Sequence, residues 1–158
     1  MRIAGVQMDV KIGDIAGNVT RMIERLREAR GHGAELAVFP ECSLAGYCFD
    51  NRSEALPYAQ SIPGPATAEF QEVCAELDCL MAFGLLEADG DKLFNAAALV
   101  GPEGVIGSYR KVHLPYLGID RYNDYGDRPF AVQEARDVKF GLNICYDAGF
   151  PESARVLT

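Results

Sequence analysis

The chain has 158 residues, of which 49% are hydrophobic and 24% charged, a composition typical of one soluble globular domain. Its net charge of −8 and the absence of a basic run argue against a nucleic-acid partner. No apolar run is long enough to span a bilayer, and the start MRIAGVQMDV lacks the features of a signal peptide. We therefore expect a single cytoplasmic domain over residues 1–158, with neither nucleic acid nor membrane as a partner.

The cysteines predict neither disulfides nor a metal site. Their number is odd, no two have CxxC spacing, and the expected compartment is reducing. The two histidines, His32 and His113, lie far apart and show no ligand spacing. We therefore expect no metal and no disulfide among the five cysteines, which are Cys42, Cys48, Cys74, Cys79 and Cys145.

The first forty residues predict a β-α-β unit. Ile3–Met8 is a short apolar strand, and Leu36–Phe39 is a second one, ended by a proline. Between them, apolar residues follow helical spacing, with Asn18 as the expected N-cap and Gly31 as the expected stop. Glu41 follows the second strand directly.

A second helix, a meander and a long loop follow. Ala66–Leu77 is amphipathic, after the irregular, proline-rich segment Pro57–Pro65. Lys111–Pro129 is a polar loop, and a loop of that length in a compact domain is usually functional or disordered. The apolar strands expected between helix and loop are Leu80–Leu86, Leu93–Val100 and Val105–Tyr109.

The stretch Gly141–Glu152, GLNICYDAGFPE, combines the end of a strand, a turn and the start of a helix. Apolar residues alternate from Val138 to Ile144, which is the period of a strand with one buried face. Cys145 then begins the turn, and Pro151 lies near the start of the helix. Such a junction pushes the thiol out of the sheet, and the helix start favours its thiolate, so Cys145 should be the most reactive cysteine. The alternative is an ordinary buried cysteine.

Three titratable residues each lie at or just past the end of an apolar strand: Glu41, Lys111 and Cys145. Strand ends on one side of a sheet are where α/β proteins collect catalytic groups. Each residue alone has an ordinary surface or core explanation, but together they predict one site. Their side-chain tips should then lie within roughly 3–5 Å of one another.

The segments VFPECSLAGY, YRKVHLP and GLNICYDAGFPESAR resemble the three motif blocks of the nitrilase superfamily, the carbon–nitrogen hydrolases, in the family's order. The opening IAGVQMDVKIGDIAGN resembles that family's first strand and loop. The resemblance implies an α/β fold, the nitrilase-like α-β-β-α sandwich, and a homo-oligomer (a dimer or higher) paired through its helical face. It also implies hydrolysis of a non-peptide C–N bond without metal or organic cofactor.

The resemblance further implies a Glu-Lys-Cys triad of Glu41, Lys111 and Cys145. Cys145 would be the nucleophile that forms an acyl-thioester, and Glu41 the general base. Lys111 would place positive charge beside the thiolate and the oxyanion. The backbone N–H of Tyr146 would be the second oxyanion donor.

The sequence departs from the family in two places. Many members carry a further glutamate in the loop after the lysine, but HLPYLGIDRYNDYGDRPF has none, so Asp120 is the nearest candidate for positioning substrate and Asp124 the next. The chain also stops at Thr158, just after the nucleophile strand and turn, and so resembles the N-terminal part of the catalytic domain. We therefore expect exposed apolar faces and little hydrolase activity from residues 1–158 alone.

A small amide is the expected substrate, because amidases are the broader group in the family. Nitrile hydrolysis and N-carbamoyl hydrolysis are alternatives within the enzyme class. Outside it, the chain would be an inactive fragment or pseudoenzyme that acts only in binding or assembly. Whether the reading frame continues past Thr158 would separate these hypotheses.

Overall fold

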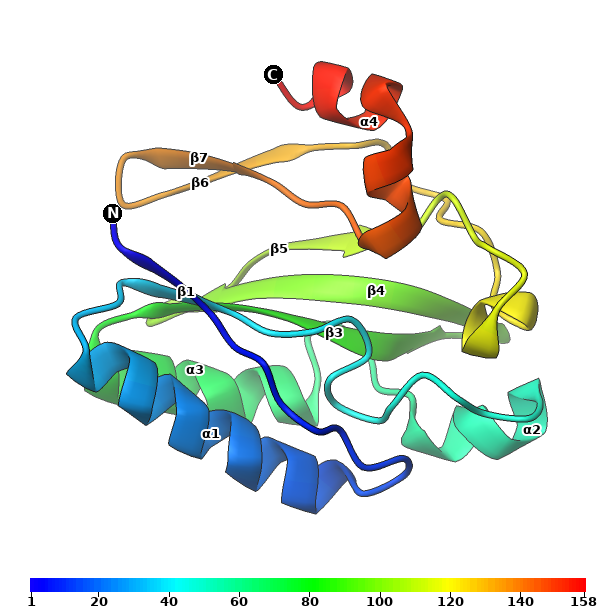
Figure 1. The fold of residues 1–158 in the computed structure, drawn as a ribbon, viewed down its shortest axis with the longest axis horizontal. Helices are drawn as coiled ribbons and strands as arrows, with labels where there is room; N and C mark the ends of the chain where they lie inside the picture. Colours follow the sequence, from blue (N-terminus) through cyan, green and yellow to red (C-terminus); the bar gives the residue numbers. More distant parts are fainter.

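A five-stranded mixed sheet forms the centre of the protein, in a computed structural model that describes all 158 residues (Figure 1). The strands lie side by side in chain order; β1, β2 and β3 are parallel, and β3, β4 and β5 are antiparallel. This arrangement confirms the predicted α/β class. The strands are β1 (Ile3–Gly5), β2 (Leu36–Val38), β3 (Leu80–Asp89), β4 (Lys92–Gly101) and β5 (Gly104–Arg110).

Two helices, α1 (Ile15–Gly31) and α3 (Pro65–Leu77), cover one face of this sheet (Figure 1). They meet the sheet in a core of 17 buried residues, where the Phe70 and Phe83 rings pack edge to face with centroids 4.8 Å apart. Burial of one such side chain contributes about 1.5–3 kcal/mol. The helical spacing of apolar residues therefore predicted the positions of both helices, except for the start of α1.

Helix α1 begins about one turn earlier than predicted, with Asp14 as its N-cap. The Asp14 side chain accepts a hydrogen bond from the backbone N–H of Gly17 at 3.0 Å. Asn18 is instead buried within the helix, where its amide donates to the backbone carbonyls of Lys11 and Leu44. The prediction of Asn18 as the cap was wrong because both residue types can cap a helix, and contacts with distant segments occupy Asn18.

A hairpin covers part of the opposite face, and the sequence predicted only its second strand. β6 (Val132–Ala135) pairs antiparallel with β7 (Val138–Gly141). Arg136 and Asp137 between them have φ values of 51° and 59°, as in tight two-residue hairpin turns. Burial alternates along β7 and on to Ile144, as predicted, although strand pairing ends at Gly141.

Helix α4 (Pro151–Val156) lies outside the hairpin, so the layers are helices, main sheet, hairpin and helix (Figure 1). A Cβ atom on Gly141 would meet the Leu157 side chain at 2.9 Å, which shows how closely the end of α4 packs on β7. This layer order confirms the predicted α-β-β-α sandwich. Short elements lie between the longer ones: α2 (Arg52–Ala55), and the 3₁₀ segments η1 (Leu56–Tyr58), η2 (Gly118–Arg121) and η3 (Cys145–Gly149).

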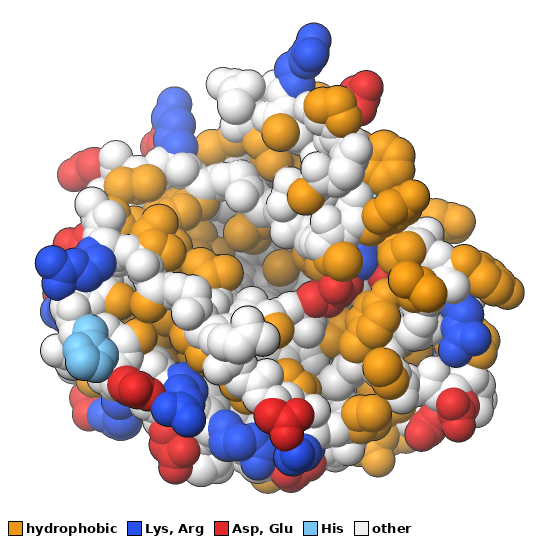
Figure 2. Space-filling view, viewed as in Figure 1, with side chains coloured by type: hydrophobic (Ala, Val, Ile, Leu, Met, Phe, Trp, Pro, Cys, Tyr) orange, Lys and Arg blue, Asp and Glu red, His pale blue; other side chains and the backbone are white.

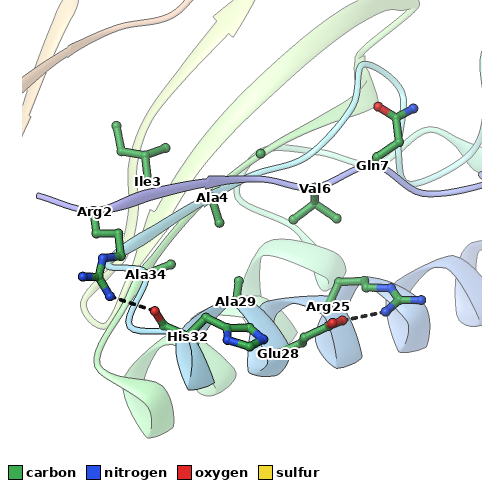
Figure 3. Close-up of a pocket in the computed structure, with 11 residues that line it drawn as sticks. Arg2, Ile3, Ala4, Val6, Gln7, Arg25, Glu28, Ala29, His32 and Ala34 are labelled. Carbon is green, nitrogen blue, oxygen red and sulfur yellow. Dashed lines mark hydrogen bonds and ion pairs between the residues drawn. The ribbon is translucent and has the colours of Figure 1, made fainter.

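The main sheet is open at the β1 edge. Ile3 is 59% exposed, and Val38 on the neighbouring strand is 41% exposed. Residues at this edge line a cavity of about 440 Å³ between the β1 segment and α1. Figure 3 shows the side chains of Ala4 and Val6 pointing toward α1 and that of Ile3 pointing away from α1. The β1 edge therefore presents apolar side chains to solvent. No helix combines the length and apolar character needed to cross a membrane.

Candidate active site

The structure brings Glu41 and Lys111 into direct contact. Lys111 follows β5, its side chain is fully buried, and its Nζ lies 2.6 Å from Glu41 Oε1 and 2.7 Å from Asp120 Oδ2. Burial alone would lower the pKa of Lys111, but the hydrogen bonds and charges of Asp120 and Glu41 outweigh it, and the net shift is upward. Lys111 is therefore a fixed positive charge at neutral pH and is excluded as a general base.

Asn95 on β4 belongs to this cluster, and sequence reasoning missed it. Its side-chain Nδ2 donates to Glu41 Oε1 at 2.6 Å and to Asp120 Oδ1 at 2.8 Å, and the residue is 1% exposed. The Asn95 amide therefore fixes the distance between the carboxylates of Glu41 and Asp120. Both carboxylates also accept hydrogen bonds from the same ammonium group. The available signal was a polar residue within the otherwise apolar run of Leu93–Val100, because a buried amide needs hydrogen-bond partners.

Asp120 is a buried member of this cluster. Its side chain is fully buried and accepts from Lys111, Asn95 and the hydroxyl of Tyr47, the last at 2.9 Å. Burial, followed by the hydrogen bond and charge of Asp120, raises the pKa of Tyr47, so this hydroxyl stays a donor. The donors around Asp120 therefore include the ammonium of Lys111, an amide and a phenol. Asp124, the next acidic candidate, lies elsewhere and pairs with Arg52 at 2.8 Å.

Cys145 begins η3 and shares a cavity of about 210 Å³ with Glu41. This cavity lies between the main sheet and the segment that follows β7, where Figure 2 shows a hollow surrounded by hydrophobic side chains. The backbone of Cys145 has φ 47°, a left-handed conformation that few residues other than glycine adopt. The chain therefore turns sharply at this residue, as predicted, and the side chain is presented to the cavity.

The environment of Cys145 raises its pKa, contrary to the expectation from the sequence. Burial is the first cause, and the negative charge of Glu41 and a hydrogen bond to its carboxylate follow. Lys111 lowers the pKa, as predicted, and so does the backbone N–H of Tyr146, but they do not outweigh those effects. Cys145 is therefore a thiol at neutral pH, and a nucleophilic role would need a base to remove its proton.

Gly84 on β3 lets the Glu41 segment approach the sheet. A Cβ atom there would lie 2.4 Å from the backbone nitrogen of Cys42 and 2.7 Å from the Cα of Glu41. We expect Gly84→Ala to lower the free energy of unfolding by about 1–3 kcal/mol, because rigid backbone must move. Gly5→Ala is the matched control, since no atom lies within 4 Å of a Cβ on that β1 glycine. Urea unfolding measures both; equal effects would contradict the close approach described here.

No group of three or more His, Cys, Asp or Glu side chains is arranged to hold a metal ion. All five cysteines are free thiols. Glu41, Lys111 and Cys145 together present a carboxyl group, a fixed cation and a free thiol.

Comparison with known proteins places these observations in a family. The sequence profile described as "Carbon-nitrogen hydrolase" matches residues 2–158. The chain is 39% identical to a nitrilase from Pyrococcus abyssi, over 99% of this chain and 60% of the relative. It is 32% identical to an omega-amidase from Homo sapiens, over 98% of this chain and 58% of the relative.

A solved structure agrees with the sequence comparisons. A CN-hydrolase superfamily protein from Xanthomonas campestris superposes with a TM-score of 0.82 at 26% identity, over 96% of this chain and 55% of that one. The chain spans about 60% of the length of these two curated relatives. Because the family profile extends over nearly every residue, the chain belongs to the carbon–nitrogen hydrolase family.

Proposed function

We propose that this chain carries the catalytic residues of a hydrolase that cleaves the C–N bond of small amides through an acyl-thioester on Cys145. The observation that supports this most is the position of Glu41. Lys111 and Asn95 both donate to its Oε1, while the side chain lines the same cavity as Cys145. Its Oε2 is then available to take the thiol proton. A base beside a thiol of raised pKa is what thiol-based acyl transfer requires.

The proposed reaction has two halves. In the first, Glu41 takes the proton of Cys145, the thiolate attacks the amide carbonyl carbon, and Glu41 returns the proton to the departing ammonia or amine. In the second, Glu41 takes a proton from water, the resulting hydroxide attacks the thioester, and the carboxylic acid leaves as the thiol reforms. Lys111 and the backbone N–H of Tyr146 stabilise the oxyanion in both halves.

The buried cluster supports this division of roles. Asp120 and Asn95 hold the Lys111 ammonium and the Glu41 carboxylate in fixed positions, so neither group has to reorganise as charge develops. Asp120 acts through Lys111 in this scheme and is a positioning residue. No step in it needs a metal or an organic cofactor.

Nitrile hydrolysis is the second candidate, because the relative that is 39% identical is named a nitrilase. The same thiolate would add to the nitrile carbon and give a thioimidate. An N-carbamoyl substrate would pass through the same steps as an amide. An inactive chain that acts only in binding or assembly is the alternative outside the enzyme class.

The test is intact-mass analysis of the protein, as its gene encodes it, after incubation with a panel of small amides and nitriles. An amide should add the substrate mass less one ammonia, and a nitrile should first add its whole mass, in each case on the Cys145 peptide. Cys145→Ser and Cys48→Ser are the paired variants, since both cysteines are exposed. Adducts that persist in Cys145→Ser, or no adduct and no ammonia release with any member of the panel, would refute the proposal.

We also propose that the protein forms a homo-oligomer. The open edge of β1 and the exposed apolar side chains of Ile3 and Val38 support association, because such edges pair readily with other chains.

A further inference from the structure

A second buried carboxylate, Asp147, lies two residues after Cys145 and belongs to a separate network. It is fully buried and accepts hydrogen bonds on both oxygens. Oδ1 lies 3.0 Å from the backbone nitrogen of His113 and 2.7 Å from its Nδ1. Oδ2 accepts from the Tyr109 hydroxyl at 2.8 Å and from the backbone N–H of Ile144 at 3.0 Å. Since a carboxylate is an acceptor only, four donors converge on this one side chain.

These partners come from the two segments that carry Lys111 and Cys145. Tyr109 and His113 lie two residues before and two residues after Lys111. Ile144 directly precedes Cys145, and the N–H of Asp147 donates back to the Ile144 carbonyl at 3.0 Å. Asp147 thus connects the end of β5 to the turn at Cys145 without touching the Lys111 ammonium.

The turn needs this support. The left-handed backbone of Cys145 is a strained conformation that persists only when its surroundings hold it in place. Ser153 adds to the hold, because its hydroxyl lies within hydrogen-bond distance of the carbonyls of Asp147 and Phe150. The ring of Phe150 in turn stacks on His113, with centroids 3.8 Å apart. The segment from Ile144 to Ser153 is therefore fixed to the end of β5 at several points.

The hydroxyl of Tyr109 is a dependable donor in this network. Burial, followed by the hydrogen bond and charge of Asp147, raises the pKa of Tyr109, so its proton stays in place across the neutral range. The ring of Tyr109 also stacks on Phe130, with centroids 5.3 Å apart, which holds the hydroxyl in position independently of Asp147.

We propose that Asp147 is a positioning residue that holds the thiol of Cys145 and the N–H of Tyr146 in register with Glu41 and Lys111, by tying the turn to the end of β5. This inference rests on the proposed function, because it assigns the purpose of the geometry to a reaction at Cys145. Asp147 itself does not line the Cys145 cavity.

The test measures whether Cys145 still senses Glu41 when Asp147 is changed. The pH midpoint of Cys145 alkylation by iodoacetamide is determined by peptide mapping in the native protein and in Asp147→Asn, each with and without Glu41→Gln. In the native background, Glu41→Gln should lower the midpoint by about one pH unit, a tenfold change in thiolate at fixed pH. In Asp147→Asn, the side-chain amide places an NH₂ group against the donors that the carboxylate accepted from, so the turn is held less firmly. Glu41→Gln should then lower the midpoint by less than about a third of a pH unit.

Two further variants separate positioning from simple destabilisation. The Glu41 effect is the shift in the Cys145 midpoint that Glu41→Gln causes. Tyr109→Phe keeps the ring stack and removes one donor to Asp147, so it should reduce the Glu41 effect by an intermediate amount. It takes the place of Asp147→Asn if that variant does not fold. Leu26→Ala truncates the core on the other face of the main sheet and should keep the full effect. A full Glu41 effect in both Asp147→Asn and Tyr109→Phe would overturn the inference. The absence of any Glu41 effect in the native background would overturn the proposed Glu41–Cys145 pair, and with it the inference.

Discussion

Replacing Lys111 with methionine should lower the free energy of unfolding by about 3–5 kcal/mol, because it leaves buried carboxylates without their cation. The Lys111 side chain is fully buried and sits between Glu41 and Asp120, and the Asp120 side chain is also fully buried. A loss of this size is a large share of the total stability of about 5–15 kcal/mol typical of a domain. Urea unfolding measures it, and any hydrolysis should be lost as well, since the oxyanion would lose its charged partner.

Two companion variants make the Lys111 result interpretable. Lys111→Met combined with Asp120→Asn should recover part of the lost stability, because one of the unpaired charges is then gone. Lys92→Met is the matched control, since the Lys92–Asp127 pair at 3.1 Å is exposed and such pairs contribute about 0–1 kcal/mol. If Lys111→Met cost no more than Lys92→Met, the buried cluster would not be the source of stability argued here.

Replacing Glu41 with glutamine should make the Cys145 thiol more acidic while greatly slowing hydrolysis. The pKa of the Cys145 thiol is raised, first by burial and then by the charge of Glu41, so removing that charge lowers it. Native Cys145 should therefore alkylate with a pH midpoint above the roughly 8.5 of an unperturbed thiol, and Glu41→Gln should increase alkylation at pH 7.5 by about tenfold. Hydrolysis should fall by about 10²–10⁴-fold, because the thiol and the water lose their base.

Faster alkylation together with slower hydrolysis is the result expected of a general base. A residue that only supports the structure of the site would not produce this combination. Glu103→Gln, the same substitution in the exposed turn between β4 and β5, is the control and should change neither quantity. Slower alkylation of Cys145 in Glu41→Gln at every pH would show that Glu41 does not raise the pKa of the thiol, and would contradict the electrostatics described above.

Strand and helix periodicity in the sequence predicted most of the architecture. Both long helices, the central strands and the turn at Cys145 lie where apolar spacing and turn residues placed them. The strand β6 was missed because Val132 is exposed and the strand is only four residues long, so it carries little periodic signal. Its pairing with β7 depends on a two-residue turn formed by Arg136 and Asp137, neither of which is glycine.

The sequence by itself determined the family and, through the resemblance of its motif blocks, the layer order. It also marked Glu41, Lys111 and Cys145 as site candidates, because local pattern alone can locate the strand ends near which they lie. Only the tertiary structure decided which groups surround them. Asn95 and Asp147 are joined to the site by contacts across 25 to 54 residues of sequence, and no local pattern encodes such distances. The direction of the Cys145 pKa was also decided there, because burial and the charge of Glu41 act through space and outweigh Lys111 and the Tyr146 N–H.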